Sequence, residues 1–284
     1  MNAVSKINEL ALPEKARWRH LPRFYVEVTN FNQNSIFALP QHMFQHAIKV
    51  RRLKMGQYFI VFDGAGIEYL ASLQTIMRSS ATAYWHDSQM ISRESSINVC
   101  LVMGLIASEK MDWVIQKATE LGVTSIQPIL TQHSFQMAEH RFAEKERHWN
   151  GVVVAACEQS GRNILPSLQP LTPLTEYLTH ENNTSLPVLK WLLSPFAEES
   201  LASKVHTELF LPNNVPSTSL SSSSNNKPTM NKRSIRFFIG PEGGFSENEE
   251  NLMRTEGCIA MSLGERILRA ETAAIAALSQ VLLV

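Results

Sequence analysis

The segment IGPEGGFSENE, residues 239–249, gathers residues with special backbone and acid–base properties into one turn. Its three glycines are Gly240, Gly243 and Gly244. Because glycine lets a backbone bend sharply and lets a ligand lie against it, the turn is a candidate ligand cradle. Glu242 is the one carboxylate among these glycines. Ser246 and Glu249 have the spacing of a capping box, which predicts that a helix begins there and satisfies its own first amides.

The sequence of this turn does not match the known phosphate-binding loops. No Lys-Ser or Lys-Thr pair follows the glycines, and their spacing is not that of a dinucleotide-binding fingerprint. A plain turn between the apolar strand predicted over Ile235–Ile239 and the following helix stays open as an alternative, since Gly-Pro turns are common.

A second segment, LGERILRAETAAIAAL at residues 263–278, places Arg269 and Glu271 at the start of a predicted helix. Acids are favourable at a helix N-terminus, whereas an arginine gains nothing from the helix dipole there. Arg269 therefore either forms an ion pair, with Glu265 or Glu271, or is held to meet a ligand. Glu271 has the ordinary alternative of a helix-start acid, and Glu242 that of an ion pair in its turn.

The two segments are expected to lie close together. In an open α/β sheet, ligands bind outside the carboxyl ends of the strands, and both turns follow predicted strands. Leu263, Ile267 and Leu268 would add apolar side chains. Together with bare backbone they would form a flat apolar pocket, which suits an adenine ring without phosphates.

The elements that must position these residues are α/β in pattern. Continuous apolar runs alternate with helical patterns, as expected for a mostly parallel sheet that is buried on both faces. The predicted strands are 97–106, 124–130, 188–193, 235–239 and 259–263. The predicted helices are the one that Ser108 caps and that ends at about Leu121, 139–160, the one from Ser246, and 269–283. We assign residues 91–284 to this domain. Residues 212–233 are a serine-rich, low-complexity segment, which we expect to be a flexible insertion.

The N-terminal part has a different pattern. Residues 1–17 are expected to be a loose extension, and residues 18–90 a small β-barrel. Aromatic and β-branched residues are concentrated at 23–28, 57–63 and 67–73, with a hairpin signal at Asp63–Gly66.

Charge is distributed unevenly along a chain of 284 residues with a formal net charge of zero. Residues 1–54 hold nine Lys and Arg against three Glu, a balance of +6 that indicates a local anionic partner. Basic residues interleaved with aromatic ones are typical of RNA binding. The residues expected to contact RNA are Arg23, Lys49, Arg51 and Arg52.

Several classes of protein are disfavoured. The three cysteines are far apart and the histidines have no metal-ligand spacing, so we expect buried free thiols and no metal. The N-terminus has no apolar signal-peptide region, and no segment is apolar enough to span a bilayer. We expect a cytoplasmic protein that has no membrane partner.

GPEGGFSENE together with LGERILRAETAA resembles the C-terminal signature of the ribosomal small-subunit methyltransferase E family, in the SPOUT class. RFYV at 23–26, His46 with Val50-Arg51-Arg52, KMDWVIQKATELGVTSIQPILT at 110–131 and ACEQSGR at 156–162 resemble further segments of that family. The resemblance runs from about residue 23 to the C-terminus, except for the serine-rich segment. Gln132-His133-Ser134 departs from it, because Glu-Arg-Ser is usual there.

The resemblance implies a PUA-like β-barrel followed by a SPOUT domain with a deep trefoil knot, which works as a homodimer. It implies S-adenosylmethionine as cofactor and methylation of N3 of a uridine in 16S rRNA, near the decoding region of the 30S subunit. The cofactor residues that it implies are Gly240, Pro241, Glu242, Gly243, Gly244, Leu263, Gly264, Ile267 and Leu268.

Methylation of uridine N3 requires removal of a weakly acidic proton. A carboxylate can accept it if burial raises its pKa, so Glu271 and Glu242 are candidate bases. Arg269 is the candidate for stabilising charge on the uracil oxygens. Two alternatives stay open, namely an RNA-binding or ribosome-assembly protein without catalysis, and methylation of a ribose 2′-hydroxyl.

Overall fold

A computed structural model describes residues 12–27, 35–181, 188–210 and 233–283. The expected N-terminal extension falls mostly outside these residues, as does the expected insertion at 212–233. The described residues divide into two compact units, the first within 1–94 and 154–165, the second within 95–153 and 166–284. The last part of helix α4 (Phe142–Ser160) thus groups with the first unit, although the expected domain boundary lies at residue 90.

The first unit is built on a five-stranded sheet with the order β1-β3-β4-β5-β2. The strands are β1 (Arg23–Tyr25), β2 (Ile36–Ala38), β3 (Tyr58–Phe62), β4 (Ile67–Ile76) and β5 (Ala81–Met90). All neighbours are antiparallel except β1 and β3. The expected hairpin at Asp63–Gly66 is confirmed, and Asp63 Oδ1 accepts hydrogen bonds from the amides of Ala65, Gly66 and Ile67.

Short helical segments that the periodicity did not predict complete the core of this unit. They are the 3-10 helix η1 (Lys15–His20), helix α2 (Gln41–Phe44) and the π-helix η2 (Gln45–Val50). Met43, Phe44 and Ala47 are buried against Phe24 and Phe59, so these turns supply apolar side chains that the strands alone lack.

The expectation that Arg23 contacts RNA is wrong. Arg23 is 6% exposed, and its Nη1 donates a hydrogen bond of 2.9 Å to Glu68 Oε2. Burial would raise the pKa of Glu68, but hydrogen bonds from Arg93, Arg23 and Gln89 outweigh burial and lower it to about 2. Glu68 is a buried carboxylate on an apolar strand, and a buried charge needs a partner. Arg23 is therefore the buried partner of Glu68 and is not exposed for contact with RNA.

Glu158, near the end of α4, joins that helix to the sheet and to η2. Its Oε1 accepts a hydrogen bond of 3.0 Å from the Tyr25 amide, and its Oε2 lies 3.1 Å from His46 Nδ1. Burial raises the pKa of Glu158 to about 7, and burial together with the charge of Arg51 lowers the pKa of His46. Both shifts favour the neutral forms, so below about pH 7 a Glu158 carboxylic acid can donate to a neutral imidazole.

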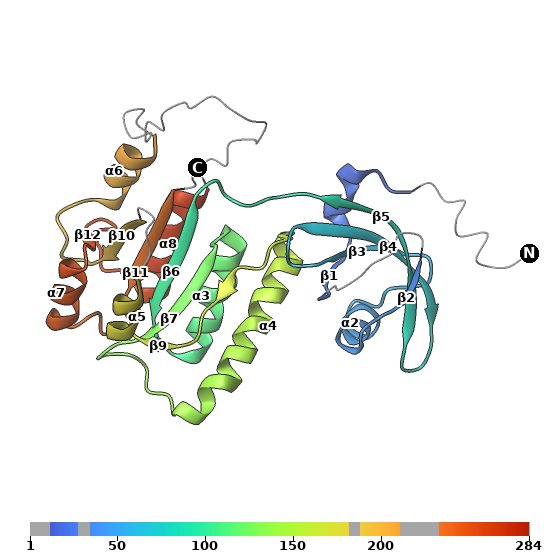
Figure 1. Cartoon of the computed structure of the whole chain (residues 1–284), viewed down its shortest axis with the longest axis horizontal. Coiled ribbons are helices and arrows are strands. Elements are labelled where there is room, and N and C mark those ends of the chain that lie inside the picture. Colours follow the sequence, from blue (N-terminus) through green and yellow to red (C-terminus); the bar gives the residue numbers. More distant parts are fainter. Residues whose placement is uncertain (1–11, 28–34, 182–187, 211–232, 284) are drawn as a thin grey trace, which may run out of the picture. The chain divides into compact units, whose positions relative to one another are not determined.

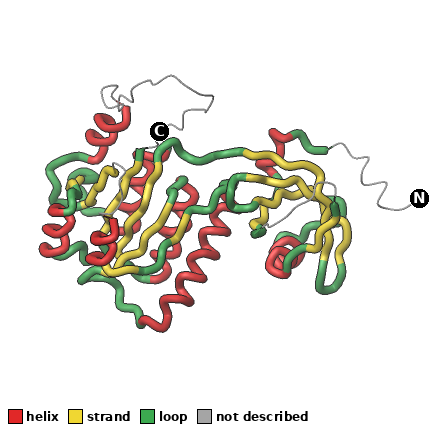
Figure 2. Tube along the Cα trace, viewed as in Figure 1, coloured by secondary structure: helices red, strands yellow, loops and turns green. Residues whose placement is uncertain are grey.

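The second unit is an α/β layer structure (Figures 1 and 2). Its seven-stranded parallel sheet has the order β12-β10-β11-β6-β7-β8, and β9 also pairs with β7. The strands are β6 (Asn98–Gly104), β7 (Ser125–Leu130), β8 (Ser167–Leu168), β9 (Thr172–Pro173), β10 (Val188–Leu193), β11 (Ser234–Ile239) and β12 (Ile259–Met261). The five apolar runs that predicted strands are confirmed, with small changes at their ends.

Helices cover both faces of this sheet. The remaining helices are α3 (Ser108–Leu121), η3 (Glu139–Arg141), α5 (Leu174–Glu181), α6 (Leu201–Val205), η4 (His206–Phe210), α7 (Glu247–Thr255) and α8 (Ala270–Leu282). One face packs Val102, Leu192 and Phe238 against α5 and α7, while α3 and α8 pack against each other. In the described part of the chain, no helix is both long and apolar enough to cross a membrane.

The strand order determines where the turns meet. Strands β10, β11 and β6 are consecutive neighbours, and β12 pairs with β10. Because all four run parallel, the loops that follow them leave the sheet from one edge. These loops begin after Gly104, Leu193, Ile239 and Met261.

The Glu158–His46 pair predicts a specific dependence of stability on pH. Folding raises the pKa of Glu158 above its value in the unfolded chain, so its contribution is complete below the unfolded pKa of about 4.5 and is lost as the pH rises through about 7. Glu158→Gln keeps a donor for His46 and an acceptor for Tyr25 but does not titrate. From about pH 5 to about pH 8, the wild type should lose about 1–3 kcal/mol relative to this variant.

Urea denaturation of both proteins across this range measures the difference. His46 titrates in both, so the comparison isolates the carboxyl group. Two parallel curves of unfolding free energy against pH would contradict a buried neutral acid at this position.

Candidate functional site

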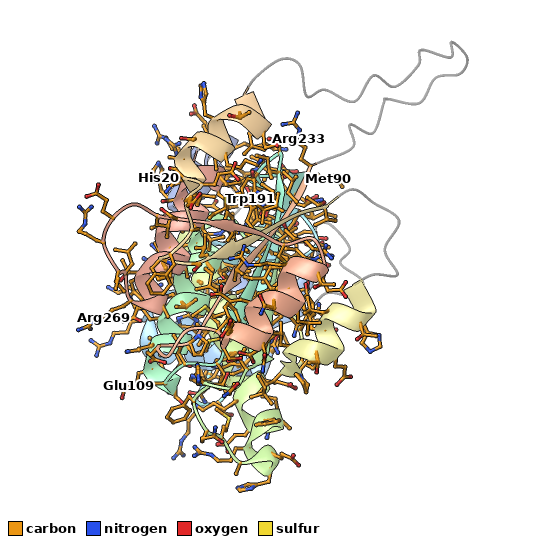
Figure 3. All side chains as sticks on the ribbon, turned by 90° about the vertical axis from the view of Figure 1, so that its left-hand side faces the viewer. His20, Met90, Glu109, Trp191, Arg233 and Arg269 are labelled. Atoms are coloured by element: carbon orange, nitrogen blue, oxygen red, sulfur yellow. The ribbon has the colours of Figure 1, made fainter. Side chains whose placement is uncertain are left out.

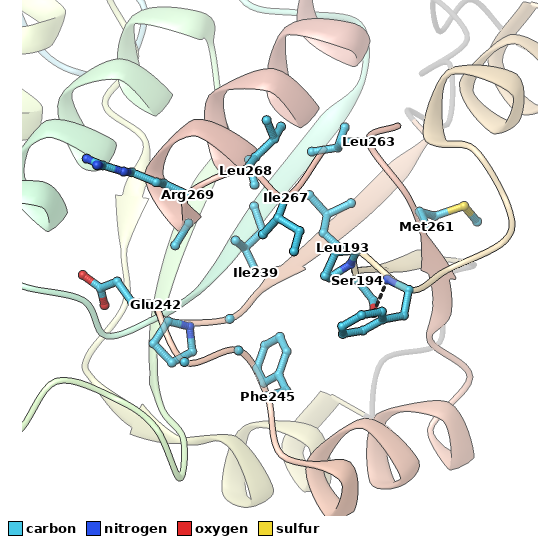
Figure 4. A pocket seen from close by; sticks show the side chains of 18 of the residues that line it. Leu193, Ser194, Ile239, Glu242, Phe245, Met261, Leu263, Ile267, Leu268 and Arg269 are labelled. Carbon is cyan, nitrogen blue, oxygen red and sulfur yellow. Dashed lines mark hydrogen bonds between the residues drawn. The ribbon is translucent and has the colours of Figure 1, made fainter. Parts of the chain in front are cut away.

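Loops at the carboxyl edge of the parallel sheet line one cleft of about 730 Å³ (Figure 4). Both turns singled out from the sequence contribute to it. The predicted residues that line the cleft are Gly240, Pro241, Glu242, Gly243, Gly244, Leu263, Gly264, Ile267, Leu268 and Arg269. Glu271 is not among the lining residues. The structure thus brings together two segments that are about 20 residues apart in the sequence.

The glycine turn is closely packed on itself. A Cβ atom on Gly240 would lie 3.0 Å from the carbonyl carbon of Gly244, and Gly244 has φ of +71°. The Gly244 amide donates to the Pro241 carbonyl over 2.9 Å, which closes the turn. The capping box is confirmed, because the Ser246 amide donates to Glu249 Oε2 and the Glu249 amide to Ser246 Oγ. Helix α7 therefore satisfies these amides without a ligand.

Two neighbouring segments support the turn from outside. A Cβ atom on Gly104, at the end of β6, would lie 2.6 Å from Pro241 Cδ, so only glycine permits this contact. A Cβ atom on Gly243 would lie 2.9 Å from His133 Cβ, and His133 Nδ1 lies 3.3 Å from the Gly244 carbonyl oxygen. His133, which departs from the resembled family, thus touches the candidate cradle.

The second loop and a third one supply the apolar wall. Gly264 has φ of +99°, and a Cβ atom there would meet no protein atom within 4 Å, so its backbone borders open space. Ile267 is 79% exposed beside it. The loop after β10 adds Leu193 and Phe196, the latter 87% exposed. This third loop was not predicted to belong to the site, although its strand was predicted, because only the order of strands in the sheet places it here.

Arg269 is the N-cap residue of α8, and it is exposed at the rim of the cleft (Figures 3 and 4). Among the described residues no carboxylate lies within 4.0 Å of its guanidinium, so the expected alternative of an ion pair with Glu265 or Glu271 is not what the structure has. An unpaired guanidinium at a cleft can bind an anionic or carbonyl oxygen of a ligand.

Lys110 was not singled out as a site residue, yet it lines the cleft and approaches both candidate carboxylates. Its Nζ lies 3.0 Å from Glu242 Oε1 and 3.8 Å from Glu271 Oε1. Partial burial would raise the pKa of Glu242, but the hydrogen bond and charge of Lys110, together with hydrogen bonds from the backbone of Glu242 and Ala107, lower it. Glu242 is therefore an ion-pair partner and a weak base. Glu271 Oε2 is buried and has no hydrogen-bond partner in the described structure.

The remaining candidates lie in the first unit. Lys49, Arg51 and Arg52 are exposed at and after the end of η2, whereas Arg23 is buried. Arg52 has φ of +54°, an uncommon conformation for a residue with a side chain, which often marks a functional turn. No group of His, Cys, Asp and Glu side chains within the described residues has the arrangement of a metal site.

Comparison with known proteins agrees with this architecture. A family model for an RNA methyltransferase domain matches residues 93–282, and one for an RNA methyltransferase PUA domain matches residues 39–83. A ribosomal RNA small subunit methyltransferase E of Synechocystis is 31% identical over 233 residues, which are 82% of this chain and 68% of that protein.

Solved structures give the same relationship. A ribosomal RNA small subunit methyltransferase E from Neisseria gonorrhoeae, bound to S-adenosyl methionine, has a TM-score of 0.74 and 30% identity, with 92% of this chain and 96% of that chain covered. A Legionella pneumophila structure in complex with SAM has a TM-score of 0.74 and 28% identity, over 91% and 96% of the two chains. The chain therefore belongs to the RNA methyltransferase domain family, within the group of ribosomal RNA small subunit methyltransferases E.

Proposed function

We propose that this protein transfers a methyl group from S-adenosylmethionine to N3 of a uridine in 16S rRNA, in the decoding region of the 30S subunit. The observation that carries the proposal is the convergence of two bare-backbone turns and an unpaired arginine on one cleft. The likeness to a relative whose structure contains S-adenosyl methionine supports the choice of cofactor. We also propose that the protein works in the cytoplasm as a homodimer, with the trefoil knot that its resemblance implies.

The residues of the cleft fit this cofactor. A volume of about 730 Å³ suits a molecule of that size, because small-molecule pockets have about 300–1,000 Å³. The apolar side chains Leu193, Leu263 and Ile267 suit an adenine ring. The cleft also has charged side chains of both signs, as a ligand with cationic groups and a carboxylate requires, namely Lys110, Glu242, Glu250, Arg266 and Arg269. When bound, the cofactor supplies a methyl group on a positively charged sulfur.

The chain's own residues then have separate roles. The turn Gly240–Gly244 and the loop Leu263–Leu268 hold the cofactor through backbone and apolar contacts. Arg269 stabilises the negative charge that develops on the uracil oxygens when N3 loses its proton. Glu242 is poorly suited to accept the N3 proton, because its pKa is lowered. Glu271 lies behind the cleft wall, which favours a supporting role.

RNA contact is proposed for the exposed residues Lys49, Arg51 and Arg52. Each guanidinium or ammonium that neutralises a phosphate releases counterions, and this makes affinity depend on salt. Because N3 lies on the Watson–Crick edge, the target uridine must be unpaired or flipped when it reacts.

Methyl transfer tests the function most directly. Labelled S-adenosylmethionine is incubated with 30S particles and with naked 16S rRNA, and the product nucleoside is identified by mass spectrometry. We expect a uridine methylated at N3. Arg269→Ala should reduce the rate by about 100-fold or more, as expected for loss of a charge-stabilising group, while the exposed control Arg147→Ala keeps it. A ribose-methylated product, or cofactor binding without transfer, would favour one of the two alternatives.

Cofactor binding is tested with a matched pair of glycine substitutions. Gly264 and Gly257 both have positive φ and open space at the Cβ position, but only Gly264 lines the cleft. Alanine at either position should lower the free energy of unfolding by about 1 kcal/mol, because a residue with a Cβ atom is strained at positive φ. Calorimetry should show binding of S-adenosylmethionine weakened about tenfold or more by Gly264→Ala and unchanged by Gly257→Ala. Equal affinities in both variants would remove this loop from the cofactor site.

RNA contact is tested by the salt dependence of binding. Replacing Lys49, Arg51 and Arg52 together by Ala should reduce the slope of log affinity against log salt by about 2 to 3 for 16S rRNA fragments. Replacing Arg141, Lys145 and Arg147 in the second unit removes the same charge and should leave the slope nearly unchanged. The opposite ranking of the two triple variants would show that RNA docks elsewhere.

A further inference from the structure

Lys110 lies where three loops of the second unit meet. It belongs to the first turn of α3, which follows β6. Glu242 belongs to the glycine turn after β11, and Glu271 to the first turn of α8, after β12. The ammonium lies 3.0 Å from one carboxylate and 3.8 Å from the other. One cation thus connects the two loops that line the cleft.

We propose that Lys110 is a positioning residue, which fixes the glycine turn through Glu242 and the start of α8 through Glu271, and so keeps the cleft ready for its ligand. This inference rests on the proposed function, because the ligand is taken to be S-adenosylmethionine.

The pair of Lys110 and Glu242 has little value as a stabiliser of the whole fold. The side chains of Lys110 and Glu242 are 36% and 41% exposed, and ion pairs with that exposure contribute about 0–1 kcal/mol. Its value is local. A turn with three glycines loses much conformational entropy when it is ordered, so a contact that holds it before the ligand arrives improves affinity.

Glu242 lies between two residues of the turn that are held by steric contacts. Gly104 admits Pro241 on one side, and His133 touches Gly243 on the other. Glu242 stands between these two contacts in the sequence, and its carboxylate accepts hydrogen bonds from the Lys110 ammonium and from the Ala107 backbone amide. Removing the ammonium takes away the charged partner of Glu242 in the described structure and leaves the amide contact alone to hold this side chain.

The environment of Glu271 indicates that Lys110 also positions the start of α8. Its side chain is only 16% exposed, and Oε2 is buried without a hydrogen-bond partner. Among the described residues, Lys110 is the one cation within 4.0 Å of this carboxylate. A poorly solvated carboxylate without a neighbouring cation is unfavourable, so loss of Lys110 also disturbs the first turn of α8, which adjoins Leu268 and Arg269.

The test is calorimetric titration of S-adenosylmethionine into the full-length protein, with thermal unfolding measured in parallel. Lys110→Met should raise Kd about tenfold and shift Tm by no more than about 2 °C. Lys110→Arg keeps the charge and should recover most of the affinity. Lys117→Met is the control, since Lys117 lies on the same helix, has similar exposure and pairs with Glu120 within the helix. It should leave Kd unchanged.

A double-mutant cycle identifies the route of the effect. Glu242→Gln changes an exposed side chain and should raise Kd, but by less than Lys110→Met, which also removes the contact with Glu271. The double variant should bind no more weakly than Lys110→Met alone, because that variant already lacks the contact with Glu242. Additive losses would overturn the proposal, and so would wild-type affinity in Lys110→Met or in Glu242→Gln. Absence of binding by the wild type would instead overturn the proposed function.

Discussion

The site depends on one constraint, the parallel direction of four neighbouring strands. Because β12, β10, β11 and β6 run the same way, the loops that follow them emerge along a single edge of the sheet. Apolar burial on both faces of the sheet fixes these strand ends in place. The sheet thereby holds residues that are far apart in the chain near one another, and direct contact between the loops is not required for this.

Glycine backbone lines part of the cleft, and such backbone is intrinsically flexible. Glycine is needed where segments approach too closely for a Cβ atom, as at Gly104 beside Pro241 and at Gly243 beside His133. The same residues would leave the turn disordered if nothing held it. Steric contact with neighbouring segments and the ion pair of Glu242 with Lys110 both restrict it. These contacts from the surroundings add to the hydrogen bond between the Gly244 amide and the Pro241 carbonyl within the turn itself.

The strands, the capping box and the two cleft turns were predictable because each is a local pattern of residues. The loop after β10 and the role of Lys110 were not, since both depend on which strands are neighbours in the sheet. Arg23 was misjudged for a similar reason. Its charge is visible in the sequence, but its partner Glu68 is 45 residues away and becomes evident only from the pairing of β3 with β4 and β1.

The central claim is that two turns of exposed main chain, joined at one edge of the sheet, form the seat of S-adenosylmethionine. A crystal structure of the protein grown with that compound tests it most directly. We expect the adenosine moiety between Gly240–Gly244 and Leu263–Leu268, with the strands in the positions described above. A structure in which the cofactor occupies another part of the molecule, or in which side chains close this cleft, would contradict the claim.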